Sequence, residues 1–339
     1  MPPSPSTEDA AATVRVGTRA SALALTQTGT VADLLAAAGP LRTELVRITT
    51  DGDRLTGSLV ALGGTGVFVT ALREALLDGR CDVAVHSLKD LPSAGADGLV
   101  LGAVPVREDP RDALCARDGL TLATLPAGAR VGTGSPRRAA QLRAARPDLV
   151  ILDIRGNVDT RLRRVAPGDL DAVVLARAGL ARLGRLDAVT ELIDVLTMSP
   201  APGQGALAVE VRSEAATDPG HPLARALAAV DHAPSRLAVT AERALLARLE
   251  AGCAAPIGAH ARLTGTTLAL DAVVCRVDGS ERLRRSQIVE VGALAVASGD
   301  GHAVVDGAQL AAAVGLGTEV AEVLLADGAG DLAELGALQ

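Results

Sequence analysis

The chain has 339 residues, enough for two or three domains that each bury a core of their own. Apolar residues make up 48 % of it, yet it holds one Phe and no Trp or Tyr, so its cores must be built from aliphatic side chains. The net charge of −7 argues against non-specific binding to nucleic acid, and the missing aromatic rings remove the platforms on which single strands stack.

Cysteine usage and the polar start of the chain favour a reducing compartment. The four cysteines, at positions 81, 115, 253 and 275, form no CxxC pair, which disfavours a metal site or a disulfide framework. Residues 1–13 are polar and acidic, unlike a signal peptide, and we find no run of about 18 apolar residues that would span a bilayer. We therefore expect a cytoplasmic protein without a membrane partner.

From residue 14 the chain alternates short apolar runs with amphipathic stretches. This pattern predicts strands at "VRVGT", "TELVRIT" and "CDVAVHS", and helices at residues 20–37 and 67–78. Strands that alternate with helices are typical of a mostly parallel sheet with helices on its faces. The prolines and charges of "REDPRDAL", residues 107–114, indicate a boundary after this first lobe.

The same alternation begins again at residue 130. The prolines and glycines of "TMSPAPGQGALAVEV", residues 197–211, then predict a hinge and a strand that returns to the first domain. After about residue 232 the pattern changes to one long helix, three strands near 256–263, 267–276 and 283–291, and a closing helix near 307–326. The sequence thus predicts two α/β lobes joined by hinges and a smaller C-terminal α+β domain: domain 1 at 14–106 and 206–228, domain 2 at 111–199, and domain 3 at 232–339.

Polar and cationic residues gather where predicted strands end and helices begin. Ligands of open α/β sheets bind beyond the carboxyl ends of the strands, and helix N-termini with adjacent arginines suit carboxylates or phosphates. Residues 130–164 hold nine arginines and three aspartates, a local charge of +6 in an acidic protein. A polyanionic ligand is predicted, with a solvated helix face as the alternative. The residues concerned are Arg19, Ser21, Lys89, Asp90, Thr133, Ser135, Arg137, Arg138, Arg155, Asn157 and Arg161.

Lys89 is the only lysine in a chain that has 32 arginines, and it stands beside Asp90. A position that keeps lysine here indicates a need for a compact charge on a thin stem, although chance is the alternative explanation. Among cations in a cleft, the lone carboxylate of Asp90 is suited to act as acid and base, whereas by itself it would equally suit a helix cap.

Other features give weaker indications. "GTGSPRR" lacks the spacing of a nucleotide-binding loop, and "LGGTGV" does not follow a strand, so neither predicts a nucleotide site. Cys253 lies in "LEAGCAAPIG", just after the long helix of the third domain, in a turn that could expose its sulfur. By its sequence context alone a structural role for this cysteine is the more common one.

Seven segments, in order between about residues 14 and 265, resemble the porphobilinogen deaminase (hydroxymethylbilane synthase) family. They are "RVGTRASALAL", "DVAVHSLKDLP", "REDPRDAL", "GTGSPRRAAQL", "DIRGNVDTRL", "PGQGALAVE" and "LEAGCAAPIG". The resemblance implies two lobes like those of periplasmic binding proteins and a third domain that carries a covalent cofactor. It also implies a transferase that joins four porphobilinogen molecules head to tail with loss of ammonia and hydrolyses the chain to 1-hydroxymethylbilane.

The resemblance also implies roles for individual residues. Growth would begin on a dipyrromethane cofactor attached through a thioether to Cys253, which reverses the structural interpretation above, and no metal is implied. Asp90 matches the family's catalytic aspartate, and Lys89 would bind a cofactor carboxylate and keep Asp90 ionised. The expected cofactor- and substrate-binding residues are Arg19, Ser21, Lys89, Thr133, Ser135, Arg137, Arg138, Arg155, Gly156, Asn157, Arg161, Arg182 and Gln204.

Two positions depart from the family's usual pattern. Thr65 stands in "GGTG" where many members have "GGKG", and Gly134 stands where "GTSS" is common. Neither change removes a residue needed for the expected chemistry. The competing hypothesis is a two-lobed carboxylate-binding protein or sensor without catalysis, which explains the arginines but not a third domain with a cysteine. We expect a monomer whose partner is the small molecule porphobilinogen.

Overall fold

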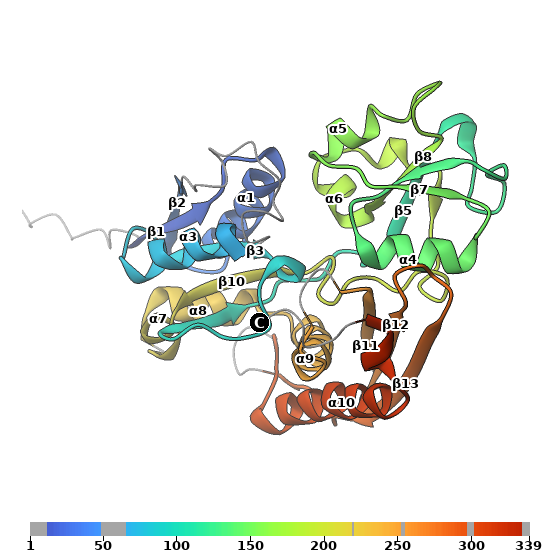
Figure 1. Ribbon diagram of the computed structural model, residues 1–339. Coiled ribbons are helices and arrows are strands. Elements are labelled where there is room, and N and C mark those ends of the chain that lie inside the picture. The colour runs from blue at the N-terminus through green and yellow to red at the C-terminus, as the bar shows by residue number, and fades with distance from the viewer. Residues whose placement is uncertain (1–11, 49–65, 219, 252–254, 297–301, 334–339) are drawn as a thin grey trace, which may run out of the picture. The chain divides into compact units, whose positions relative to one another are not determined.

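The computed structural model describes residues 12–48, 66–218, 220–251, 255–296 and 302–333 (Figure 1). It forms two compact units. The first unit comprises Met1–His86, Gly95–Ala103 and Ala208–Asp231, and the second comprises Ser87–Ala94, Val104–Leu207 and His232–Gln339.

The first unit is an α/β lobe. Its strands are β1 (Ala12–Thr18), β2 (Leu41–Arg47), β3 (Val83–Ser87), β4 (Leu99–Ala103) and β10 (Leu207–Arg212), and its helices are α1 (Ala22–Ala37), α3 (Gly66–Leu77), α7 (Ser213–Thr217) and α8 (Pro222–Val230). The sheet order is β2-β1-β3-β10-β4, with β1 parallel to β2 and β3, and β4 antiparallel to β10. The strand predicted from residues 197–211 is β10, and it lies in this sheet.

The second unit begins with a sheet of the same plan. Its strands are β5 (Asp112–Ala116), β6 (Arg130–Gly132), β7 (Val150–Leu152), β8 (Ala172–Ala176) and β9 (Glu191–Leu192), and its helices are α4 (Pro136–Ala145), α5 (Val158–Leu162) and α6 (Arg177–Arg182). The order is β7-β6-β8-β5-β9, with β6 parallel to its neighbours and β5 antiparallel to both of its own. Aliphatic side chains such as Leu114, Val131 and Leu142 fill its core.

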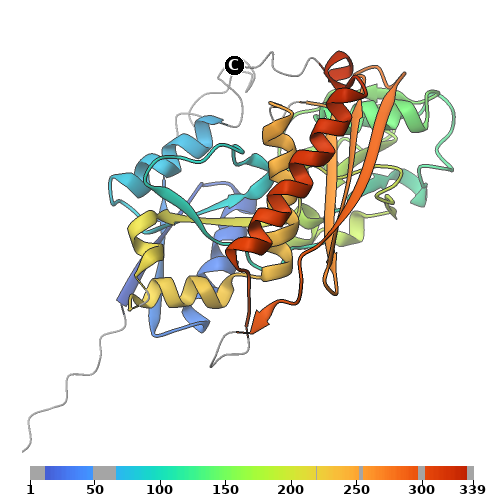
Figure 2. The same ribbon diagram turned by 90° about the horizontal axis from the view of Figure 1, so that it is seen from below.

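A third sheet completes the second unit. It is antiparallel, with β11 (Ile257–Thr264), β12 (Thr267–Cys275) and β13 (Arg282–Glu290), and the helices are α9 (Ala233–Arg248), α10 (Gly307–Ala326) and α11 (Ala329–Ala333). A short pair, β14 (Ala295–Val296) and β15 (Ala303–Val304), precedes α10. In β12, Leu268, Leu270, Ala272 and Val274 are buried because one face of the sheet packs against α9 and α10, which lie side by side (Figure 2).

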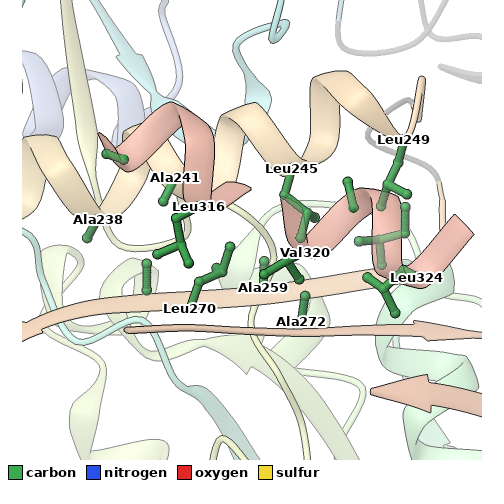
Figure 3. Packing of buried hydrophobic residues seen from close by; sticks show 14 of the residues in the cluster. Ala238, Ala241, Leu245, Leu249, Ala259, Leu270, Ala272, Leu316, Val320 and Leu324 are labelled. Atoms are coloured by element: carbon green, nitrogen blue, oxygen red, sulfur yellow. The ribbon is translucent and has the colours of Figure 1, made fainter. Parts of the chain in front are cut away.

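Small aliphatic residues allow this close packing. Ala241 and Leu245 of α9 meet Leu316 and Val320 of α10, over the strand that carries Leu270 (Figure 3). A Cβ added at Gly317 would lie within contact distance of the Ala241 carbonyl oxygen, so the two helices approach closely there. The absence of aromatic rings in this core follows from the composition of the chain.

Among the described residues, α10 is long and apolar enough by length and composition to cross a bilayer. Glu319 and Glu322 lie within it, so it is not an uninterrupted apolar run of the kind considered above. Leu316, Val320 and Leu324 pack against α9 and the sheet, which is the physical reason for the apolar composition of this helix.

The expected fold class of two α/β lobes and a smaller α+β domain is confirmed. The strands and the closing helix of the C-terminal part begin and end within about two residues of their predicted bounds. The two compact units assign the second and third sheets to one body, and the division of that body into domains 2 and 3 stays a prediction.

Candidate functional site

Asp90 lies on a single 3₁₀ turn, Leu88–Asp90, that directly follows β3. Leu88 anchors this turn because its side chain is fully buried and its N–H donates to the Ala206 carbonyl at 3.1 Å. Gly203, which has φ of +74°, lies so close that a Cβ there would be 3.2 Å from Leu88 Cγ. The glycines of "PGQG" therefore allow residues 197–211, which we call the linking segment, to hold the turn.

Lys89 and Asp90 are both half-buried on this turn. Burial lowers the pKa of the Lys89 ammonium; the negative charge of Asp90 opposes that effect, and Arg138 adds to it. Asp112 and Arg137 act on the same ammonium group. The lone lysine of the chain thus lies within electrostatic reach of both arginines of "SPRR", as a shared site requires.

Asp112, the first residue of β5, is the centre of a buried network. Its carboxylate is inaccessible to solvent and accepts hydrogen bonds from Arg137 Nη2 at 2.8 Å and from Arg138 Nε and Nη2 at 3.0 and 2.8 Å. The Gln204 side-chain amide donates to the same carboxylate at 2.8 Å and to the Pro110 carbonyl at 2.7 Å. Both arginines are therefore held by internal partners.

The charges in this network are tightly coupled. Burial alone would raise the pKa of Asp112, but the positive charges of Arg137 and Arg138 and their hydrogen bonds more than offset it, so the pKa falls to about 2. Burial lowers the pKa of Arg137, and the Asp112 carboxylate opposes that shift. Arg137 also donates from Nη1 to the Ser199 carbonyl at 2.5 Å, whereas its Nε is buried without a hydrogen-bond partner among the described residues.

Thr133 and Ser135 shape the start of α4, the helix that carries both arginines. Thr133 is buried, and its hydroxyl accepts a hydrogen bond from the Ser135 N–H at 3.2 Å. Ser135 is the N-cap, with its hydroxyl 3.5 Å from the Arg138 N–H, and Pro136 begins the helix. Their side-chain hydroxyls thus fix the local backbone.

Arg155 and Arg161 extend the positive charge beyond α4. Arg161 is half-buried and donates from Nε to the Gly156 carbonyl at 2.8 Å, and Arg155 is exposed beside Asp153. Burial lowers the pKa of Arg161, and the charges of Arg138 and Arg155 lower it further. Gly156 has φ of +110°, a backbone conformation that side chains disfavour, and Asn157 caps α5 by accepting from Thr160 N–H.

Arg182, the last residue of α6, contacts the segment that contains "PGQG". Its Nη2 donates to the Gly205 carbonyl at 2.7 Å. Burial lowers its pKa, and the nearby Glu108 carboxylate opposes that effect.

Two predicted residues lie in the first unit. Arg19 follows β1 and is half-buried, and Ser21 is the exposed N-cap of α1, accepting from the Ala24 N–H at 3.3 Å. Each is placed at a strand end or helix start, as the sequence predicts. Cys253 and Thr65 lie outside the described residues.

Asp112, Glu242 and Arg243 also contact these segments and are not among the residues predicted from the sequence. Glu242 of α9 is fully buried and accepts hydrogen bonds from Arg107 at 2.7 and 3.0 Å and from the Gly203 N–H at 2.6 Å. A charged residue inside the apolar face of a predicted helix was the available signal for Glu242. For Asp112, the sequence feature that could have indicated a role is a carboxylate at the start of an apolar strand.

Family models match most of the chain. One described as "Porphobilinogen deaminase, dipyromethane cofactor binding domain" matches residues 14–218, and one described as "Porphobilinogen deaminase, C-terminal domain" matches residues 236–326.

Curated relatives match over nearly the full length. A porphobilinogen deaminase of Leifsonia xyli subsp. xyli is 58 % identical over 326 residues, which is 96 % of each chain. One of Thermobifida fusca is 59 % identical over 278 residues, covering 82 % of this chain and 86 % of the relative.

Solved structures show a more distant likeness. The methionine-binding protein MetQ has a TM-score of 0.40 at 12 % identity and covers 64 % of this chain and 89 % of its own. The aliphatic sulphonate binding protein SsuA from Escherichia coli has a TM-score of 0.37 at 17 % identity, covering 69 % and 70 %.

Proposed function

Because this chain belongs to the porphobilinogen deaminase family, we propose that Asp90 and the cationic residues around Asp112 form its catalytic site. The activity is that of hydroxymethylbilane synthase, a transferase of porphyrin biosynthesis. It polymerises four porphobilinogen molecules head to tail with loss of ammonia and hydrolyses the product to 1-hydroxymethylbilane. Its cofactor is dipyrromethane, and a carboxylate-binding protein without catalysis is not favoured.

The observation that carries the site assignment is the excess of positive charge in one body of the protein. Asp90, Asp112, Arg137 and Arg138 act on the charge of Lys89, and Arg138, Arg155 and Asp153 act on that of Arg161. Porphobilinogen carries an acetate and a propionate side chain, so each added ring brings two further carboxylates. Guanidinium groups suit such ligands because they bind carboxylates through paired hydrogen bonds.

The arginines divide into two groups by their present partners. Arg137 and Arg138 are tied to Asp112, so they contribute mainly charge and a fixed α4 start. Arg155 and Arg161 are more accessible, and we assign to them the direct grip on carboxylates. The remaining expected residues keep their proposed roles in binding.

Asp90 supplies the proton chemistry in this proposal. Loss of ammonia from the substrate needs a proton donor at the leaving amine and then an anion near the cation that remains. A carboxyl group on a turn next to Lys89 can do both, because it alternates between its protonated and ionised forms. The positive charge of Lys89 lies within electrostatic reach of this carboxyl group.

The residues of the site suit the cofactor, whose carboxylates need the same cationic groups. When bound, dipyrromethane supplies the pyrrole to which the first substrate unit is joined. We assign its attachment to Cys253. Burial raises the pKa values of the other three thiols, Cys81, Cys115 and Cys275, to about 11, 12 and 11, which makes them poor nucleophiles.

We also propose that the enzyme works in the cytoplasm as a monomer, without a nucleic-acid or membrane partner. The acidic net charge and the near absence of aromatic residues support the lack of a nucleic-acid partner.

The attachment of the cofactor to Cys253 and the role of Asp90 as the acid are tested separately. The denatured protein is expected to exceed its sequence mass by two pyrrole units, and Cys253→Ser is expected to lose that mass.

Asp90→Asn is expected to lower turnover by at least about 10²-fold, the lower end for general acid catalysis. Asp97→Asn, an exposed residue, is the matched control. Wild-type turnover in Asp90→Asn, or an unmodified mass in active protein, would contradict the assignment.

A further inference from the structure

Arg243, on α9, binds the backbone that follows Asp90. Its Nη1 donates to the Leu91 carbonyl at 2.9 Å, and its Nη2 donates to the carbonyls of Pro92 and Ser93 at 2.6 and 3.3 Å. One guanidinium thus spans three consecutive carbonyls, the first of which belongs to the residue after Asp90. The planar fork of an arginine is suited to this, and a lysine ammonium is not.

The turn that carries Asp90 has few internal hydrogen bonds. It is a single 3₁₀ turn closed by the Leu91 N–H to the Leu88 carbonyl at 3.1 Å, and Pro92 has no N–H to donate. Upstream, Leu88 fixes the turn to the linking segment. Downstream, the three carbonyl contacts of Arg243 provide the corresponding anchor, so the position of Asp90 depends on both.

Helix α9 is a rigid base for this contact. Glu242, the neighbour of Arg243, accepts from Arg107, from Gly203 N–H and from Ala261 N–H at 2.7 Å. The opposite face of the helix packs through Ala241 and Leu245 into the core shared with α10 (Figure 3). Gly203 also borders Leu88, so α9 fixes both anchors of the turn.

We propose that Arg243 is a positioning residue that holds the Asp90 carboxyl group at the reacting amine. The proposal rests on the role given to Asp90 above. Arg243 acts through the backbone of the turn and not on the substrate. Its loss should therefore weaken the proton transfer step while leaving the binding of porphobilinogen largely unchanged.

The test measures kcat and KM for porphobilinogen, together with the mass of the denatured protein as a readout of cofactor content. Arg243→Ala is expected to lower kcat by about 10- to 100-fold, the scale of a small misplacement of a catalytic group. KM should stay within about twofold, since ground-state binding is unaffected. The cofactor mass should remain.

Two further variants make the measurement specific. Arg248 lies on the same helix and pairs with Glu322, and Arg248→Ala should retain wild-type kcat. Arg243→Lys keeps the charge but replaces the two donor nitrogens by a single ammonium group, so its kcat should lie between those of wild type and Arg243→Ala. It also preserves the test if Arg243→Ala fails to fold.

The decisive comparison uses the Asp90→Asn background. If Arg243 acts through Asp90, adding Arg243→Ala, or Arg243→Lys, to Asp90→Asn causes no further loss of kcat. If the kcat losses of the two substitutions multiply in the double variant, the positioning role is overturned and the proposed function is not. A fall in kcat that is matched by a loss of cofactor mass would have the same meaning. Wild-type turnover in Asp90→Asn by itself would overturn both this inference and the proposed function.

Discussion

At the scale of single residues, Lys89 shows why one cationic position differs from the other 32. Its ammonium lies within reach of Asp90, Asp112, Arg137 and Arg138, and burial lowers its pKa. A guanidinium is broader and remains charged under all ordinary conditions. It would also bind Asp90 through two parallel hydrogen bonds and turn the carboxyl group away from the amine.

We therefore predict that Lys89→Arg folds but loses at least about tenfold in turnover or cofactor content, within the range of a misplaced acid. Turnover and denatured mass are the measurements. Arg130→Lys, an exposed exchange in the opposite sense, should behave as wild type. Equal performance of Lys89→Arg would show that the lone lysine is a matter of chance.

Candidate site residues could be identified from the sequence only where they follow the end of a predicted strand. Asp90, Lys89 and the "SPRR" arginines were found in that way, and the structure brings them within electrostatic reach of one another. Asp112 was missed because its segment indicated only a boundary. Arg243 was missed because its partners are backbone carbonyls about 150 positions away, which no local pattern reveals.

At the scale of elements, the turn between β6 and α4 explains one departure from the family pattern. A Cβ added at Gly134 would lie 2.5 Å from the Ile154 carbonyl oxygen, closer than such atoms approach. A serine at this position requires the two backbones to separate. The glycine therefore fits the close approach of the two backbones at this point.

Gly134→Ser is predicted to lower the free energy of unfolding by about 1–3 kcal/mol, the usual cost of overpacking. Chemical denaturation provides the measurement. Gly179→Ser, at a helix position with open space around it, should change stability by no more than about 0.5 kcal/mol. If both variants unfold at the same denaturant concentration, the backbone at Ile154 moves aside without loss of stability and the prediction is wrong.

The bounds of most elements could be predicted because their apolar periodicity is local. The helix at residues 20–37 begins at Ala22, and the one at 67–78 is found as Gly66–Leu77. The order of the strands within each sheet could not be predicted in the same way, since β5 and β10 pair with strands far away in the sequence.

At the scale of the whole molecule, buried carboxylates link stability to pH. The folded state holds the pKa of Asp112 at about 2, below its ordinary value of 3.8, and the pKa values of Asp82 and Glu210 are also lowered against the effect of burial. A depressed pKa contributes stability that is complete above the unfolded value and is lost as pH falls through the folded one.

Stability is therefore predicted to decline between about pH 4 and pH 2, with Asp112 contributing on the order of 2 kcal/mol. Asp112→Asn should flatten this decline and, at neutral pH, cost about 3–5 kcal/mol, because two buried arginines lose their counter-charge. Denaturation across this pH range is the measurement. Asp118→Asn, at an exposed site, should leave the profile unchanged, and an unaltered profile in Asp112→Asn would contradict the prediction.

The aliphatic core has an optical consequence. With no Trp or Tyr and a single Phe in 339 residues, the polypeptide is nearly transparent at 280 nm and lacks the usual protein fluorescence. Absorbance or fluorescence in the near ultraviolet and visible range will therefore report a bound chromophore, such as a pyrrole chain oxidised to a conjugated form, with almost no protein background.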